Sequence, residues 1–217
     1  MVNFSDIRTA SNTLYNYDDI ANATGFTVNY LFATRDSTGN EFQIAEQQLY
    51  SNPIHIGGVG SPQGHDPVVT TTTFRSSPLN SGRVMRGRVY FDFYHDVSSS
   101  GGAGSSHSSS VTVKLYHYDG SSATQIGSTW TAETIQTAIA TNETVGQIEC
   151  GYIDVDDDDT NFFAVGHQIQ VVVASTLTQS GGNSTGSDDV YFDPVDRIAP
   201  PQSRITFRMV FPWKLHI

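Results

Sequence analysis

The chain contains 217 residues, and its 22 acidic and 11 basic side chains give a formal net charge of −11. This excess of negative charge argues against a nucleic-acid partner, whose phosphate backbone attracts basic proteins. Hydrophobic residues make up 37% of the chain and aromatic residues 11%, which is enough for a folded core and excludes wholesale disorder. Apolar runs are only a few residues long, so no membrane-spanning segment and no membrane partner are expected.

Cysteine content and the start of the chain bear on where the protein is made. Cys150 is the single cysteine, so internal disulfides and cysteine-based metal clusters are excluded. The first residues show neither the basic region nor the apolar region of a signal peptide. We therefore expect synthesis in a reducing cytoplasm, with stability supplied by sheet pairing, core burial and association.

In chain order, the first feature is a segment without periodicity. Residues 1–24 carry scattered aromatic side chains between polar ones, and we interpret them as an extended N-terminal arm. Residues 25–217 are predicted to form one domain. Its first strand follows Gly25, where apolar and polar side chains begin to alternate. Next come a turn at 35–40, an extended stretch at 41–56 and a loop at 57–67.

The clearest strand is predicted from Arg83 to Tyr94. Its side chains alternate with a period of two, which is incompatible with a helix. One face carries Met85, Gly87, Val89, Phe91 and Phe93, and the other carries Arg86, Arg88, Tyr90, Asp92 and Tyr94.

The second half of the chain alternates strand patterns with polar stretches. Two segments rich in Gly, Ser and Thr, 98–110 and 176–189, are predicted to be loops. Residues 131–144 are compatible with either a short helix or an extended connection, because isoleucines at i and i+4 compete with β-branched threonines. Further strands are predicted from Val111, at 126–130, 147–155 and 167–175, and at 204–215.

These patterns predict an all-β fold. About eight to ten strands, joined by polar turns and without alternating helices, suit an antiparallel β-sandwich of the jelly-roll kind with an extended N-terminal arm. No internal repeat of solenoid or propeller length is present.

No motif predicts catalysis, a cofactor or a metal site. The acidic run Asp154, Asp156, Asp157, Asp158 and Asp159 lacks the glycine and distal glutamate of a calcium loop, and we interpret it as a solvated corner, with calcium as the alternative. The histidines are scattered, and no nucleophile elbow or phosphate-binding loop is present. We therefore expect no catalytic residues, no cofactor and no resident metal, and we expect that the chain is not an enzyme.

The only basic cluster shares the polar face of the predicted strand 83–94 with tyrosines. One interpretation is a solvated face paired with acidic residues of the same chain. The other is an interface at which guanidinium groups pair with carboxylates of another subunit. The candidate interface residues are Arg86, Arg88, Tyr90 and Tyr94.

Several segments resemble proteins of tailed viruses. They are Tyr116-His117-Tyr118-Asp119-Gly120 after a Val-Thr-Val strand, the segment 191–197, the closing segment 210–217 and the passage 17–26. Over most of the chain, as a loose pattern, the sequence resembles the capsid decoration (cement) proteins of marine phages and archaeal tailed viruses. The resemblance implies a structural virion protein on the outer capsid surface, made in the host cytoplasm. It also implies a homotrimer with the major capsid protein as partner.

Two alternatives remain open. A tail-fibre, spike or carbohydrate-binding module for host attachment would use surface aromatic side chains for stacking on sugars, with Tyr90, Tyr94, Tyr116 and Trp130 as candidates. A sandwich enzyme such as a hydrolase is the other alternative, but no motif favours it.

Overall fold

The structure, a computed structural model, describes residues 24–35, 40–46, 55–60, 66–100, 104–139, 142–156, 161–182, 184–192 and 207–214. Apart from Thr24, the expected N-terminal arm lies outside these residues, as do Asp157, Asp158 and Asp159 of the acidic run. Within the described ranges no helix is long and apolar enough to cross a membrane.

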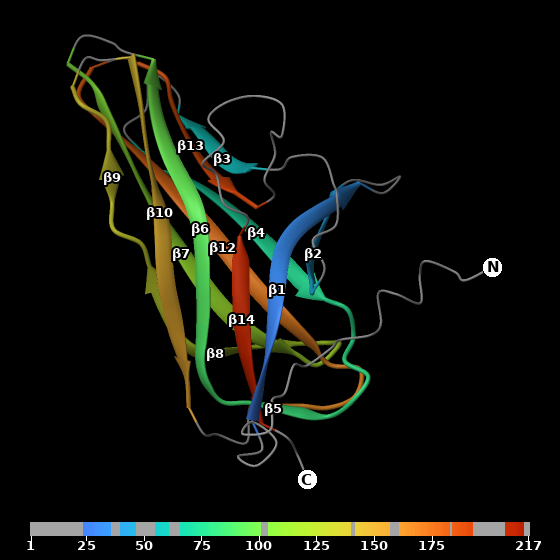
Figure 1. Cartoon of the computed structure of the whole chain (residues 1–217). Helices are drawn as coiled ribbons and strands as arrows, with labels where there is room; N and C mark the ends of the chain where they lie inside the picture. The colour runs from blue at the N-terminus through green and yellow to red at the C-terminus, as the bar shows by residue number, and fades with distance from the viewer. Residues whose placement is uncertain are drawn as a thin grey trace.

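The first sheet faces the viewer in Figure 1. Its lower part has the strand order β10-β6-β14-β1-β2, and at its upper end β13 and β3 continue the sheet beside β6. β10 pairs with β6 along its whole length, from Asn142 opposite Ser100 to Val155 opposite Gly87. The bounds are β1 (Thr24–Arg35), β2 (Asn40–Ala45), β3 (His55–Gly60), β6 (Gly87–Ser100), β10 (Asn142–Val155), β13 (Gly186–Tyr191) and β14 (Arg208–Lys214).

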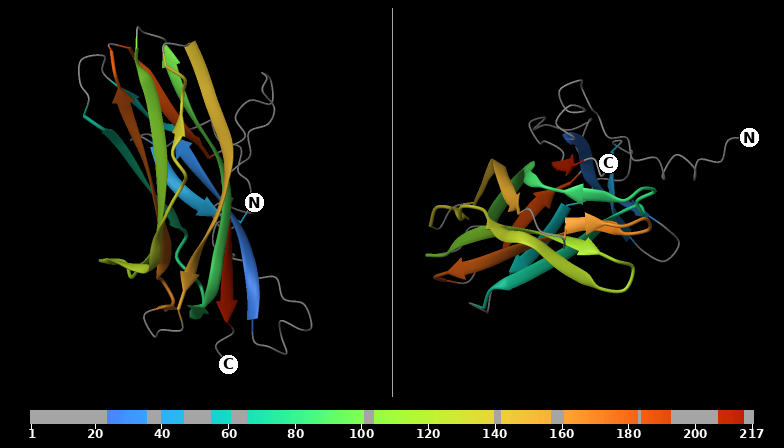
Figure 2. Two further views of the ribbon diagram at one scale, coloured as in Figure 1. Left: turned by 90° about the vertical axis from the view of Figure 1, so that its left-hand side faces the viewer. Right: turned by 90° about the horizontal axis from the view of Figure 1, so that it is seen from below.

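The second sheet lies behind the first, and the side view in Figure 2 shows the two layers. Its order is β4-β12-β7-β8, with β9 pairing with the start of β7. All pairings are antiparallel except that between β2 and β4, which joins the two sheets. The bounds are β4 (Val68–Ser76), β7 (Ser106–Tyr118), β8 (Ala123–Thr131), β9 (Ile135–Gln136) and β12 (Gln168–Ser180), with a small ladder of β5 (Arg83–Met85) and β11 (Phe162–Phe163) beside β14.

The predicted fold class is confirmed: the protein is an antiparallel, jelly-roll-like β-sandwich. The predicted alternation of strand 83–94 is also present. Met85, Val89, Phe91 and Phe93 are buried, whereas Arg88 and Tyr90 point outward. The strand is interrupted at Arg86, because Gly87 adopts a positive φ of 108° between β5 and β6.

Both predicted serine- and threonine-rich loops were wrong in extent. β6 continues to Ser100, and β7 begins at Ser106, inside the segment 98–110. β12 extends to Ser180, and β13 begins at Gly186, inside the segment 176–189. These residues are held by backbone pairing to neighbouring strands, for which a polar side chain is no obstacle.

The ambiguous stretch 131–144 is extended where the structure describes it. β8 ends at Thr131, β9 contributes two residues, and β10 starts at Asn142. Two strands were not predicted at all: the two-residue β11, and β4, whose run of four threonines obscures the alternation of buried Thr72 and Phe74 with exposed neighbours.

The core differs between the two ends of the sandwich. A large apolar cluster, which includes Phe91, Phe93 and Trp213, fills the lower and middle part. Toward the upper end the buried apolar cluster is reduced to Val97, Ile135 and Leu177, with partly buried neighbours. Buried polar side chains of this upper end include His95, Ser109 and Asp188, which are connected by hydrogen bonds. The sandwich therefore has an apolar half and a polar half.

Candidate functional site

Two tyrosines meet on the outer surface of the first sheet. Tyr90 of β6 and Tyr152 of β10 are directly opposite each other, with ring centroids 6.1 Å apart. They are 47% and 45% exposed. Outward side chains of the four adjacent strands extend this region, which we call the tyrosine face: Phe26, Val28, Arg88, Tyr90, Asp92, Ile148, Cys150, Tyr152, Asp154, Arg208 and Val210.

Two ion pairs flank the tyrosines. Nε of Arg88 donates to Oδ1 of Asp154 at 2.9 Å, and Nε of Arg208 donates to Oδ1 of Asp92 at 2.8 Å. The guanidinium of Arg88 also lies 4.5 Å from the ring centroid of Tyr152. The hydrogen bond to Asp154 raises the pKa of Arg88. Such exposed pairs contribute little stability, and their main effect is to fix the side chains beside the rings.

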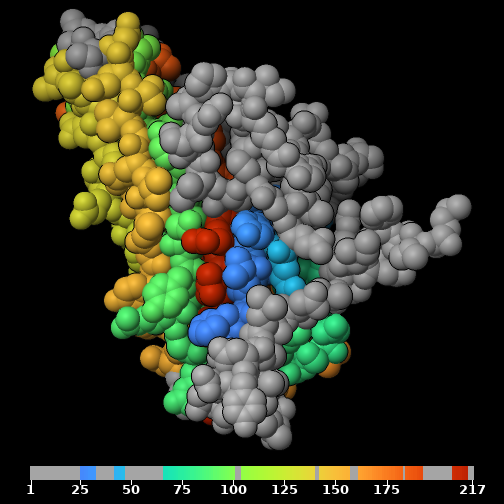
Figure 3. Space-filling model, viewed as in Figure 1, coloured from blue at the N-terminus to red at the C-terminus, as the bar shows by residue number. Residues whose placement is uncertain are grey.

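The remainder of the tyrosine face is apolar. Phe26 is 45% and Ile148 52% exposed. Val28 and Val210 are half-buried and lie opposite each other, and Val210 lies opposite Tyr90. Figure 3 shows the strands that carry these residues side by side, from β10 through β6 and β14 to β1. Since the two arginines balance the two aspartates, this face is neutral on a chain whose net charge is −11.

The four predicted interface residues are placed differently from one another. Arg88 and Tyr90 lie on the tyrosine face, and Arg86 is exposed between β5 and β6. Tyr94 is half-buried, with its ring 5.6 Å from that of Tyr191 on β13. The partner of Arg88 in the structure is Asp154 of the same chain.

Sequence reasoning missed Tyr152, Ile148 and Phe26 as surface residues. β10 was predicted as a strand, but the position of Tyr152 opposite Tyr90 depends on strand register, which the sequence does not encode locally. Trp130 was predicted to be a surface aromatic side chain, and this prediction was wrong. Its ring packs edge-on against Phe91 at 5.0 Å and Phe93 at 5.9 Å, so it is a core side chain rather than a surface platform.

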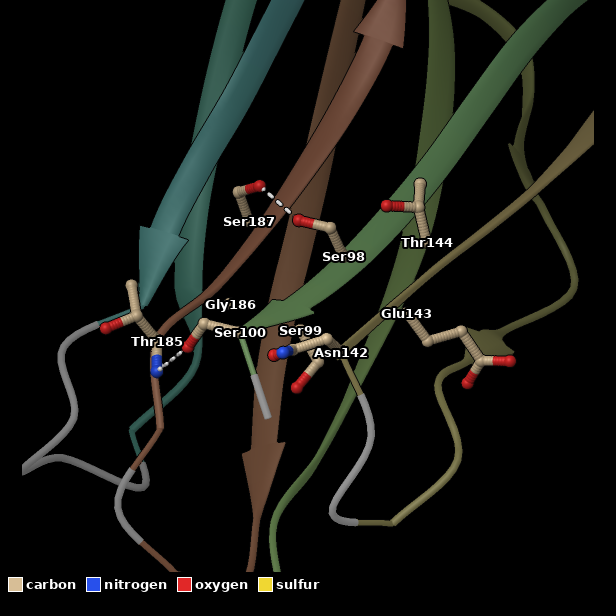
Figure 4. A pocket seen from close by; sticks show the side chains of 9 residues that line it. All are labelled: Ser98, Ser99, Ser100, Asn142, Glu143, Thr144, Thr185, Gly186 and Ser187. Carbon is tan, nitrogen blue, oxygen red and sulfur yellow. Dashed lines mark hydrogen bonds between the residues drawn. The ribbon is translucent and has the colours of Figure 1, made fainter. Parts of the chain in front are cut away.

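A second feature is a hollow of about 660 Å³ at the upper end of the first sheet. Figure 4 shows hydroxyl groups around it, and two hydrogen bonds join residues of its lining. Ser98 and Ser187 hydroxyls lie 2.7 Å apart, and the Ser100 hydroxyl accepts a hydrogen bond from the Thr185 amide. The hollow is lined by Ser98, Ser99, Ser100, Asn142, Glu143, Thr144, Thr185, Gly186 and Ser187.

Across the described residues, no three His, Cys, Asp or Glu side chains are arranged to hold a metal ion. His117 and His167 form a half-buried pair, with Nε2 and Nδ1 2.6 Å apart. Asp154 of the acidic run is engaged with Arg88, and Asp156 is exposed.

Comparison with known proteins finds no matching family model and no matching curated protein. Among solved structures, the chain is similar to an aminopeptidase from a marine sediment archaeon, Thaumarchaeota archaeon (11% identity, TM-score 0.42, 87% of this chain and 37% of the other). It is also similar to an α-amino acid ester hydrolase (12%, 0.42, 85% and 36%). A third is a carbohydrate-binding module specific for non-crystalline cellulose (11%, 0.31, 74% and 76%).

The chain spans less than two fifths of the length of these two hydrolases. The expectation that the chain is not an enzyme is contradicted by these matches to an aminopeptidase and an α-amino acid ester hydrolase. At these identities the likeness concerns the β-sandwich fold alone, which hosts many unrelated functions.

Proposed function

We propose that the chain is a β-sandwich binding module of a virion, which attaches through the tyrosine face to the outer surface of the capsid and stabilises the shell. The observation that carries this proposal is the neutral, aromatic tyrosine face on an otherwise acidic protein. The resemblance of several segments to decoration proteins supports the same partner, the major capsid protein.

The composition of the face suits a protein partner. The cores of protein interfaces are enriched in tyrosine and arginine and depleted of lysine and unpaired charge. Tyr90 and Tyr152 would supply the aromatic anchors, and the arginines enter the contact with their charges already compensated by Asp154 and Asp92. A partner can therefore cover the face without leaving a cation uncompensated.

Decoration acts through repetition. A single contact of standard size buries about 1,600 Å² in total. When many copies bind one shell, and each copy bridges neighbouring capsid subunits, the contacts act together against expansion of the shell. A homotrimer at the threefold positions of the capsid would present three tyrosine faces at once.

A second candidate function, host attachment by carbohydrate binding, is favoured by one observation. Tyr90 and Tyr152 expose their rings side by side, and Arg88 and Asp154 offer hydrogen-bonding groups next to them. This arrangement would allow stacking on a sugar ring, with polar groups at its rim.

The composition of purified virions distinguishes the two functions. A mass-spectrometric inventory should find the decoration protein at a copy number comparable to that of the major capsid protein. A tail-fibre or spike module would be present in far fewer copies, and would bind a glycan array on which a decoration protein gives no signal. Absence of the chain from the virion would contradict both.

A further inference from the structure

The polar half of the core contains buried titratable groups that the proposed capsid attachment does not use. Inward side chains of β6, β7, β10, β12 and β13 converge there. They include the buried side chains of His95, His107, Glu149 and Asp188, which we call the histidine layer.

His95 is part of a continuous chain of polar contacts across the sandwich. Its Nε2 lies 2.8 Å from the hydroxyl of Ser109, which in turn donates to Oδ2 of Asp188 at 2.8 Å. Its Nδ1 lies 3.7 Å from Oε1 of Glu149, beyond hydrogen-bonding distance. Because Ser109 donates to Asp188, the imidazole donates through Nε2, and Nδ1 is left as an unsatisfied acceptor.

His107, on β7, is the second histidine of the histidine layer. Neither ring nitrogen has a hydrogen-bond partner at bonding geometry among the described residues, although the backbone of Ser184 lies near enough to offset part of the effect of burial on the pKa. The ring fills the space beside Gly186 of β13, where a methyl group would overlap it. The cross-strand neighbour of His107 is Gln179 of β12. The backbone amide of His107 donates to the Thr137 hydroxyl, and its backbone carbonyl accepts from the Thr137 amide.

These surroundings oppose the charged form of both histidines. Burial lowers the pKa of His95 to about 4 and also lowers that of His107. The acidic groups that face the layer are Glu149 and Asp188, with exposed Glu133 near Glu149. Burial raises the pKa of Glu149, so this side chain is a poor counter-charge for a protonated His95.

The apolar clusters indicate where such a charge would act. Only Val97, Ile135 and Leu177 are fully buried hydrophobics in the upper cluster, whereas the lower cluster spans both sheets. Regions with few buried apolar contacts open at a lower free energy than the rest of a domain. The upper end is thus the part that a buried positive charge would open first.

We propose that the histidine layer makes the upper end of the sandwich an acid-sensitive element: protonation of His95 and His107 separates the start of β13 and the start of β7 from their neighbours, while the apolar half, which includes Val190 near the end of β13, stays folded. The sign follows from the linkage of folding to protonation. A histidine whose pKa is lowered in the closed state binds its proton more readily in the open state, so acidification favours opening.

Hydrogen exchange followed by mass spectrometry tests this proposal on the full chain. We compare about pH 7 with about pH 5, corrected for the intrinsic exchange rate. The wild type should show about tenfold faster exchange on acidification in peptides that cover β13 and Ser106–Ser110, with little change in β14. The double variant His95→Gln, His107→Leu should remove most of this acceleration, since glutamine retains a donor for Ser109 and leucine cannot be protonated.

His167→Gln serves as the matched control, because this histidine is half-buried and lies outside the layer. It should retain the acid response. An unchanged response in the double variant, or equal acceleration in β14, would overturn the proposal. If the double variant does not fold, proton NMR titration of the wild-type imidazoles decides: titration of both buried rings near the ordinary histidine value would also overturn it.

Discussion

The indole of Trp130 on β8 lies against the backbone of Gly151 on β10, and this contact closes one side of the sandwich. A methyl group at position 151 would come within 2.5 Å of Cε2 and 2.6 Å of Nε1 of Trp130. Nearby, Gly127 approaches the Asp154 carbonyl so closely that only glycine fits, and its φ is +66°. The outer surface of β10, with Tyr152, is positioned by these inner contacts.

The first prediction concerns this closure. Gly151→Ala should destabilise the fold by about 1–3 kcal/mol, because Trp130 and Phe91 must shift within a packed core. Urea denaturation followed by tryptophan fluorescence measures the change. Cys150→Ala, on the exposed side of the same strand, is the control and should alter stability little. Equal stability of both variants would show that the contact is loose.

The second prediction concerns a buried hydrogen bond between β14 and β1. Nε1 of Trp213 donates to the Thr27 hydroxyl at 2.8 Å, and both residues are buried. The same hydroxyl accepts a hydrogen bond from Nδ2 of Asn29 at 3.0 Å. Thr27→Val keeps the shape of the side chain but removes the acceptor of both donors, which should cost about 1–3 kcal/mol. Thr27→Ser retains the hydroxyl and should lose less than valine does. A valine variant as stable as the serine variant would contradict this assignment.

The third prediction is a pH dependence of global stability. His95 has a pKa of about 4 in the folded protein against an ordinary value of 6.5. Its contribution is fully present above the ordinary value and is lost as the pH falls from there toward 4, by about 1–3 kcal/mol. Glu149 acts in the opposite direction. Because its pKa is raised in the folded protein, its protonation on acidification favours the folded state.

Urea midpoints measured across this pH range test the expectation. The wild type should lose stability on acidification before the carboxylates titrate, and His95→Gln should flatten the curve. A midpoint that is constant between about pH 7 and about pH 5 would contradict it.

The fourth prediction concerns association. We expect a homotrimer, about three times the chain mass of 23.6 kDa, in sedimentation equilibrium. Because the tyrosine face is proposed to contact the capsid and not a second copy of the chain, replacing Arg86 and Arg88 together by glutamate should leave the trimer intact and weaken capsid binding. Asp154→Arg in the glutamate background restores opposite charges at the pair that Arg88 forms with Asp154, and should recover part of the capsid binding. A monomeric wild type at micromolar concentration would contradict the trimer.

Local pattern was sufficient to predict part of this fold. Alternation in 83–94 identified the buried Val89, Phe91 and Phe93, since a strand with one buried face must alternate. It was insufficient where side chains are polar on both faces. The end of β6 and the start of β7 consist largely of serines. Buried Ser109 is hydrogen-bonded to Asp188, which is 79 residues away in the sequence.

Only part of the tyrosine face could be predicted from the sequence. Arg88 and Tyr90 lie on one strand, so their shared face is a local property of the sequence. Tyr152 joins them through the register of β10 against β6, and Phe26 through β1 and β14. Both depend on pairings between distant segments, which are fixed by the fold as a whole.

The most direct test of the proposed function is binding of the purified chain to capsids prepared without it, measured by co-sedimentation at increasing protein concentration. Tyr90→Ser with Tyr152→Ser should weaken binding by at least about tenfold, because the aromatic anchors are lost. Val69→Ser, which changes an even more exposed apolar side chain on the second sheet, should bind as the wild type does. Wild-type binding by the double tyrosine variant would contradict a role for the tyrosine face in capsid attachment.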